Sequence, residues 1–312
     1  MTRRTLVIAL VWLLAASLPG PTLAADGPGG SGRSAASAGS AGSGRLEAAF
    51  TLTDDWGRTV RFARRPVRIV SLAPHATELL FSAGAGDRVA AADLHSDYPE
   101  AARAIARVSS YPAPDPEQLI ALRPDLVVVW GAAAAADRVA RLERLGLKVF
   151  VSEPRTLDAI ATGIERFARL ADDPASGLAR AQRFRARVEA LRARHAARAP
   201  VPVFVQAWAR PLLTLSDRDT IGDALRSCGA RNVFGAMTAA APQVGAESVL
   251  AASPRLIVAI DAGADASQWE ALRVLRPHGT IAFVRIDPAI QRPTERMLPA
   301  LERLCEAVDA AR

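Results

Sequence analysis

The segment Glu117-Gln118-Leu119-Ile120-Ala121-Leu122-Arg123-Pro124-Asp125-Leu126-Val127-Val128 returns later in the chain as Glu247-Ser248-Val249-Leu250-Ala251-Ala252-Ser253-Pro254-Arg255-Leu256-Ile257-Val258. Glu, Ala, Pro, Leu and Val recur at the same offsets, which is too ordered for chance and too long a period for a solenoid. Each copy predicts a short helix beginning at Glu, a Pro-containing turn and a buried strand of β-branched residues. The chain is therefore predicted to contain two related α/β lobes. A cleft between such lobes is a common place for a small molecule to bind.

A second pair of segments supports the duplication. The stretch 82–89 matches the stretch 227–233 with one residue deleted, from Ser-Ala-Gly-Ala-Gly-Asp-Arg-Val to Ser-Cys-Gly-Ala-Arg-Asn-Val. Around these segments, strand and helix patterns alternate, which predicts two Rossmann-like lobes, at 46–171 and 200–312. The first lobe begins with a predicted β-hairpin at 50–62, whose residues alternate around Asp-Asp-Trp-Gly.

One long helix is predicted to bridge the lobes at 172–199. After Gly177 this stretch has neither Gly nor Pro, and apolar residues such as Phe184 and Val188 recur among Ala, Arg and Glu. At about 1.5 Å per residue such a helix spans the width of a domain. We expect it to act as a rigid strut, with the ligand cleft between the two lobes.

The N-terminal segment 1–25 has the features of a secretory signal peptide. It carries two arginines, an apolar run from Leu6 to Leu18 and small residues at Ala24 and Ala25, where cleavage is expected. The alternative is a membrane-spanning helix, but that requires about 20 apolar residues. No Cys follows the apolar run, so no lipid anchor is expected, and the stretch 26–45, rich in Gly, Ser and Ala, is predicted to form a flexible linker. The mature protein is expected to be exported and soluble.

Charge and cysteine content exclude some classes of function. The formal net charge is +7, but the basic residues are spread among acids and no stretch interleaves them with aromatics, so no nucleic-acid partner is expected. The two cysteines, Cys228 and Cys305, are an even number in an exported chain, which favours a disulfide over two free buried thiols. That bond would join the first and last helices of the second lobe.

Three catalytic or cofactor patterns lack the sequence context that they would need. Gly84-Ala85-Gly86 follows a predicted helix rather than a strand, so it indicates a helix end rather than a dinucleotide site. Asp54, Ser71 and His75 could form a hydrolytic set, but no Gly-x-Ser-x-Gly motif is present. The four histidines lack metal-ligand spacing, so no metal site and no cofactor are expected.

Candidate ligand-binding residues follow the predicted strands, because ligands meet open α/β domains at the carboxyl ends of strands. These residues are Pro74, His75, His95, Tyr98, Tyr111, Trp130, Trp208, Arg210, Asp287 and Arg292. The alternative for Trp130 and Trp208 is that they cap their own strands as part of the core. A large flat ligand with apolar faces and amide edges would suit a lining of this composition.

From Arg68 to its C-terminus the chain resembles the periplasmic solute-binding proteins of the helical-backbone metal-receptor kind. These proteins serve ABC importers of cobalamin, haem and iron siderophores, and the similarity is greatest to the cobalamin binders. The residues that carry the resemblance are Ser71-Leu72-Ala73-Pro74-His75-Ala76-Thr77-Glu78, Ser96-Asp97-Tyr98-Pro99, Pro124-Asp125-Leu126-Val127, Pro242-Gln243-Val244 and the two cysteines.

The resemblance implies a periplasmic monomer without enzymatic activity, which captures a corrinoid and delivers it to an ABC permease dimer in the inner membrane. It implies that Glu117 and Glu247 dock on arginines of the permease, whereas placement beside a positive helix end is the alternative for both. It also implies that His95, Tyr111, Trp130 and the loop 287–292 contact the corrinoid.

Two departures from the family pattern bear on the ligand. His95 stands where the most similar relatives usually have Tyr, and Ala241 precedes Pro242 where they often have an aromatic residue. Haem or a ferric siderophore is therefore the alternative ligand, and a hydrolase is a remote alternative. A further hypothesis is that His95 is an axial donor to the metal of the ligand, the alternative being a hydrogen bond to one of its side-chain amides.

Overall fold

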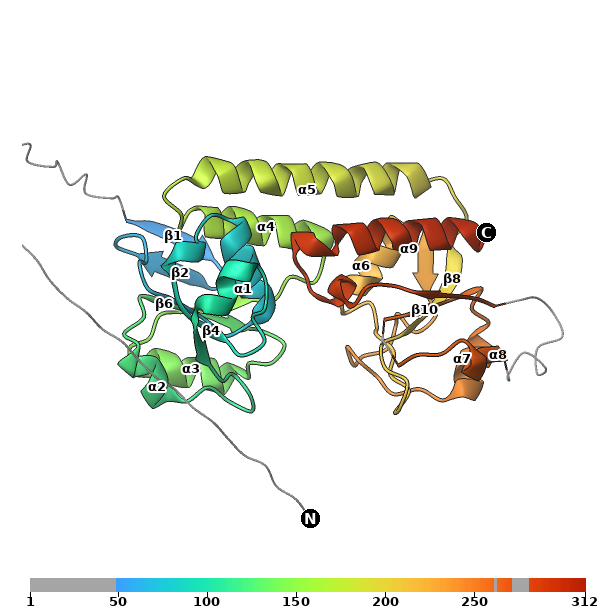
Figure 1. Cartoon of the computed structure of the whole chain (residues 1–312), viewed down its shortest axis with the longest axis horizontal. Coiled ribbons are helices and arrows are strands. Elements are labelled where there is room, and N and C mark those ends of the chain that lie inside the picture. Colours follow the sequence, from blue (N-terminus) through green and yellow to red (C-terminus); the bar gives the residue numbers. More distant parts are fainter. Residues whose placement is uncertain (1–48, 261–262, 271–280) are drawn as a thin grey trace, which may run out of the picture. The chain divides into compact units, whose positions relative to one another are not determined.

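The computed structural model describes residues 49–260, 263–270 and 281–312 (Figure 1). The predicted signal peptide at 1–25 and the predicted linker at 26–45 lie outside these residues, as does His278, one of the four histidines considered above as metal ligands. In the described part of the chain, no helix has the length and apolar character needed to cross a membrane.

The predicted hairpin is present at the start of the described chain. Strand β1 (Phe50–Thr53) pairs antiparallel with β2 (Thr59–Phe62). The Asp54 carboxylate, only 1% exposed, accepts hydrogen bonds from the backbone N–H groups of Trp56 and Arg58 in the turn and of Val151 in the neighbouring sheet. One buried carboxylate therefore shapes the turn and fastens the hairpin to the N-terminal lobe.

The N-terminal lobe is built on a parallel sheet with the strand order β5-β4-β3-β6-β7. The strands are β3 (Ile69–Ser71), β4 (Val89–Asp93), β5 (Ala106–Val108), β6 (Leu126–Trp130) and β7 (Val149–Ser152). The helices are α1 (Pro74–Ser82), α2 (Pro116–Ala121), α3 (Ala136–Arg144) and α4 (Leu157–Ala168), with 3-10 turns at Gly86–Arg88 and Glu100–Ala104. Along β6, Val128 belongs to the hydrophobic cluster with α1 and α4, whereas Val127 belongs to the cluster with α2 and α3. Helices thus cover both faces of the sheet, which explains its nearly continuous apolar strands.

The C-terminal lobe repeats this design on a parallel sheet with the order β11-β10-β8-β9. The strands are β8 (Val201–Gln206), β9 (Ala230–Asn232), β10 (Leu256–Ala259) and β11 (Ala282–Arg285). The helices are α6 (Thr220–Ser227), α7 (Ala246–Ala252), α8 (Ser267–Glu270) and α9 (Leu298–Ala310), with 3-10 turns at Pro288–Gln291 and Glu295–Met297. The prediction of two α/β lobes with parallel sheets is confirmed.

The duplicated segments have the same local structure in both lobes. The first copy forms α2 and β6, and the second forms α7 and β10. Arg123 and Ser253, the residues before the two equivalent prolines, are the non-glycine residues with positive φ in the described chain, at 46° and 53°. Gly84 and Gly229, which follow α1 and α6, also have positive φ, at 81° and 66°. Gly84 therefore ends a helix, as predicted, and the repeat extends to the backbone conformation of its turns.

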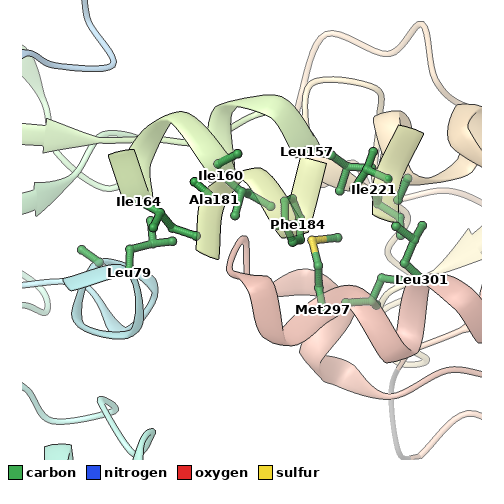
Figure 2. Close-up of a cluster of buried hydrophobic side chains, with 14 of the residues drawn as sticks. Leu79, Leu157, Ile160, Ile164, Ala181, Phe184, Ile221, Met297 and Leu301 are labelled. Carbon is green, nitrogen blue, oxygen red and sulfur yellow. The ribbon is translucent and has the colours of Figure 1, made fainter. Parts of the chain in front are cut away.

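Helix α5 (Pro174–His195) occupies most of the region predicted as one long helix. It packs against α4 and also against α6 and α9 of the C-terminal lobe (Figure 1). Figure 2 shows apolar side chains from these elements in one cluster, among them Ile164 of α4, Phe184 of α5 and Leu301 of α9. The hydrophobic core is thus continuous from one lobe to the other.

Cys228 and Cys305 form the predicted disulfide. The sulfurs are 1.98 Å apart and the Cα atoms 4.6 Å apart. Cys228 follows directly after α6, and Cys305 lies in α9. The bond therefore joins the first and last helices of the C-terminal lobe, as expected.

Candidate ligand-binding site

A cavity of about 480 Å³ lies at the carboxyl edge of the N-terminal sheet. Its walls are the loops that follow β3, β4, β5 and β6, together with one side of α3. Four candidates line it, namely the loop residues His95 and Tyr111, Pro74 at the start of α1 and Trp130 at the end of β6. The rest of the lining is mostly Pro, Ala, Val and Leu, with Asp93 at the end of β4 and Arg138 in α3 as its charged residues. This is the edge at which open α/β sheets bind ligands.

Two aromatic rings at this cavity are exposed. Tyr111 is 85% exposed and Trp130 is 45% exposed, so Trp130 is not a buried cap of its strand. Large aromatic side chains at the surface of a cavity provide apolar faces for a flat ligand. The geometry agrees with the use of these two residues as ligand contacts.

His75 lies behind Trp130 and is buried, with 4% exposure. Its Nε2 is 3.1 Å from Ser152 Oγ, and its ring meets the Trp130 ring edge-on at a centroid distance of 6.0 Å. Burial lowers the pKa of His75 to about 4, although the hydrogen bond with Ser152 acts in the opposite direction. His75 is therefore a neutral support for the indole of Trp130 rather than a member of the cavity lining.

His95 is held at the cavity by Asp93, the last residue of β4. Asp93 Oδ1 accepts the backbone N–H of His95 at 2.9 Å and lies 3.3 Å from His95 Nδ1. Asp93 is 3% exposed and also accepts a hydrogen bond from Ser110 Oγ. The imidazole itself is 79% exposed. A buried carboxylate thus orients an accessible imidazole.

Arg292 and Tyr98, two other candidates, lie at a contact between the lobes. Arg292 donates from Nη1 to Glu78 Oε1 at 3.0 Å and to Asp97 Oδ1 at 2.7 Å. The hydrogen bond from Arg292 lowers the pKa of Asp97. The ring of Tyr98 lies 4.5 Å from the Arg296 guanidinium, and Tyr98 lines a separate cavity of about 610 Å³ beside Glu78. These two residues therefore hold elements together instead of lining the cavity with His95.

Trp208, Arg210 and Asp287 belong to the C-terminal lobe and do not line the cavity of the N-terminal lobe in the described chain. Trp208 is 52% exposed and donates from Nε1 to the Arg210 carbonyl at 2.9 Å. Asp287 accepts the backbone N–H of Ala289 at 2.8 Å and caps a 3-10 turn. Like the lining residues, they follow strands at the carboxyl edge of their own sheet.

Glu117 and Glu247 occupy equivalent positions in the first turns of α2 and α7. Both are exposed, and no salt bridge to either is found among the described residues. The buried residue two positions later is Leu119 in α2 and Val249 in α7, so the two helices turn the same side inward. The two glutamates therefore occupy matching exposed positions in the two lobes.

The hydrolytic alternative gains no support from the geometry. Ser71 Oγ donates to the Ala73 carbonyl at 3.2 Å, and His75 is paired with Ser152, while Asp54 is engaged with the hairpin and Arg58. Within the described residues no cluster of three or more His, Cys, Asp or Glu side chains suits a metal ion.

Two side chains that position candidate residues, Asp93 and Glu78, were not among the predicted candidates. Asp93 ends the apolar run of β4, just before the loop that carries His95. A carboxylate at the end of a buried strand is visible in the sequence and could have identified Asp93 as a site residue. Glu78 is only 2% exposed and receives Arg292 and Thr294 from a segment near the other end of the chain. Local sequence carries no signal for that pairing.

Comparisons with known proteins agree with this architecture. A family model described as periplasmic binding protein matches residues 69–270. A vitamin B12-binding protein of Vibrio vulnificus (strain CMCP6) is 36% identical over 245 residues, covering 77% of this chain and 89% of the relative. A vitamin B12-binding protein of Vibrio campbellii is 35% identical over 256 residues, covering 80% of this chain and 93% of the relative.

Solved structures give the same result. The periplasmic vitamin B12 binding protein BtuF of Vibrio cholerae superposes with a TM-score of 0.71 at 32% identity, covering 79% of this chain and 98% of that protein. The periplasmic haem-binding protein BhuT superposes with a TM-score of 0.65 at 23% identity, covering 78% of this chain and 98% of that protein, which shows a shared fold. Because the family model spans both lobes and the two Vibrio relatives align over most of its length, the chain belongs to the periplasmic binding protein family.

Proposed function

We propose that this chain is a periplasmic binding protein that captures a cobalamin and delivers it to an ABC permease. The observation that carries the proposal is the cavity lined by exposed Tyr111 and Trp130, in a chain whose relatives at 33% to 36% identity are named vitamin B12-binding proteins. A corrin ring is a flat macrocycle with apolar faces, so aromatic rings at the rim suit it. Trp208, Arg210 and Asp287 would contact the part of the ligand that extends beyond this cavity, across a cleft between the lobes.

The second part of the proposal concerns delivery. Glu117 and Glu247, exposed on equivalent helices of the two lobes, would bind basic residues on the two halves of a permease dimer in the inner membrane. Charge pairs at a wet interface mainly set orientation and encounter rate, which suits a carrier that must dock and leave. The mature protein would be a monomer without catalytic activity, cofactor or lipid anchor, released by cleavage of its signal peptide.

Haem is the second candidate ligand, and one observation favours it. His95 and Tyr111 line the same cavity, and a Tyr and His pair is what binding of haem iron would use. The cavity has one arginine, Arg138, whereas anionic haem carboxylates or a ferric siderophore would favour more.

Titration calorimetry on the mature protein tests the choice of ligand. Cyanocobalamin is expected to bind saturably at one site, with haemin and a ferric hydroxamate binding about 100-fold more weakly or worse, a difference of about 2.7 kcal/mol. Trp130→Ala should weaken cyanocobalamin binding, since stacking on an aromatic ring contributes about 1 kcal/mol or more. Saturable binding of haemin without binding of cyanocobalamin would overturn the proposal.

A further inference from the structure

The His95 imidazole has one ring nitrogen engaged and one free. Nδ1 faces Asp93 Oδ1 at 3.3 Å, and no hydrogen bond to Nε2 is found among the described residues. The ring is 79% exposed and lines the 480 Å³ cavity, so a ligand seated there can reach it. A neutral imidazole nitrogen with a free lone pair is a good ligand for first-row transition metals.

The position of the Asp93 carboxylate beside Nδ1 favours the tautomer of His95 that carries its proton on Nδ1. Its carboxylate accepts from Ser110 Oγ and from the His95 backbone, and its own carbonyl receives Arg107 Nη1 at 3.0 Å. The same Arg107 nitrogen donates to the Ser96 carbonyl at 2.8 Å, on the other side of His95. A carboxylate that accepts Nδ1–H leaves the Nε2 lone pair available, which is the arrangement found behind histidines that bind metals.

We propose that His95 Nε2 binds directly to the cobalt of the bound corrinoid, with Asp93 as the positioning residue. This inference rests on the proposed ligand. In the step, the Nε2 lone pair forms a bond to cobalt while a cobalt-bound water leaves with its own electron pair. The oxidation state of cobalt does not change and no proton is transferred. The site would thus prefer corrinoids that have an exchangeable axial ligand.

Asp93 and Ser110 also line the cavity, but they are hydrogen-bonded to each other and Asp93 is only 3% exposed. Among the described lining residues, the competing donor is therefore the hydroxyl of Tyr111, which is 85% exposed. A phenol must lose its proton before it binds a metal strongly, and no basic side chain is hydrogen-bonded to the Tyr111 hydroxyl among the described residues. An imidazole in its neutral form offers a nitrogen lone pair without such a loss, and Asp93 faces Nδ1, the nitrogen opposite the one that would bind. The geometry therefore favours His95 over Tyr111.

Absorption spectroscopy with two corrinoids tests the proposal. Aquocobalamin carries an exchangeable water, whereas methylcobalamin carries a carbon ligand that does not exchange in the dark. Binding to the wild-type protein is expected to shift the corrin absorption bands of aquocobalamin and to leave those of methylcobalamin in place. His95→Ala should abolish the shift and weaken aquocobalamin binding at least tenfold more than methylcobalamin binding. Asp93→Asn should weaken aquocobalamin binding about tenfold, the lower end of what loss of such a supporting group costs.

Leu94→Ala is the matched control, since Leu94 is the exposed neighbour of His95 in the same loop and does not line the cavity. It should keep the band shift. An unshifted aquocobalamin spectrum in the wild-type complex would overturn metal binding by His95 while leaving corrinoid capture intact. A shift that persists in His95→Ala and disappears in Tyr111→Phe would assign the bond to Tyr111 and overturn the proposal. Absence of binding by either corrinoid would overturn the proposed function and this inference together.

Discussion

Glu78 is the residue at which a single substitution should most weaken the contact between the lobes. Its carboxylate, 2% exposed, accepts Arg292 Nη1 at 3.0 Å and Thr294 Oγ1 at 2.8 Å, and Arg296 Nη1 lies 3.4 Å away. Glu78→Gln keeps the shape of the side chain but removes its charge. It also places the amide NH2 group where a carboxylate oxygen now accepts from Arg292 or Thr294, so that two donors face each other. Loss of a charge-assisted bond in a buried site costs about 2–3 kcal/mol, so unfolding should become easier by that amount. Glu78→Ala also leaves Thr294 unpaired and should cost about 3–5 kcal/mol.

Urea unfolding followed by circular dichroism measures these changes at neutral pH. Glu295→Gln is the matched control, because Glu295 accepts Arg180 Nη1 at 2.7 Å with both side chains partly exposed, at 27% and 46%. Exposed pairs of this kind contribute about 0–1 kcal/mol. A double-mutant cycle of Glu78→Gln with Thr294→Val should give a coupling energy of about 1 kcal/mol.

A change in the free energy of unfolding for Glu78→Gln no larger than that for Glu295→Gln would contradict a stabilising role of the Glu78 carboxylate. Such a result would mean that Arg292 is satisfied by Asp97 alone, 2.7 Å away, and that the buried carboxylate carries no net stabilisation. Desolvation of a buried ion pair opposes the attraction between its charges and can cancel it. The measurement therefore distinguishes a buried pair that stabilises the fold from one that makes no net contribution.

Three other perturbations have defined outcomes. The Cys228–Cys305 disulfide closes a loop with a sequence separation of 77. Its reduction should lower the free energy of unfolding by about 4.5 kcal/mol on the chain-entropy model, and an unchanged melting temperature would contradict this. The pKa of His75 falls from 6.5 in the unfolded chain to about 4 in the folded protein, so the unfolded chain binds the proton first as the pH is lowered. The free energy of unfolding should therefore decrease by roughly 3 kcal/mol between pH 6.5 and pH 4. Urea titrations at several pH values should show that His75→Gln removes this dependence. Glu117→Arg combined with Glu247→Arg should abolish stimulation of the permease ATPase while cobalamin affinity stays within about twofold, and loss of affinity instead would place these residues in ligand binding.

Much of the fold was predictable because its signals are local. The hairpin at 50–62, the two strands of the repeated segment and the glycine that ends α1 each depend on a few consecutive residues and their periodicity. The duplication strengthened the prediction, because the same assignment of helix, turn and strand had to fit both copies of the repeated segment. The disulfide was favoured by the presence of two cysteines in a chain that was expected to be exported.

The candidate site was only partly predictable, because partner choice over long distances is set by packing. Arg292 follows a strand as a ligand contact would, yet its partners Glu78 and Asp97 are 214 and 195 residues away in sequence. His75, in the first turn of α1, is likewise a polar residue whose burial behind Trp130 arises only when the sheet is assembled. Sequence position identifies which edge of a sheet a residue reaches, but not which side chains it meets there.

A comparison of Asp93 with its counterpart in the C-terminal lobe separates the structural role of this turn from its proposed role at the ligand site. The second strand of each lobe ends in an Asx residue, Asp93 in β4 and Asn232 in β9, and each accepts the backbone N–H two residues later, at 2.9 Å and 3.1 Å. In the C-terminal lobe that later residue is Phe234, whose ring packs against Phe204, and the Asn232 amide donates to the Leu215 carbonyl. The turn itself is therefore part of the scaffold in both lobes. Only in the N-terminal lobe does it combine a carboxylate with an exposed imidazole at a cavity, and this difference between two copies of one design is what points to chemistry at His95.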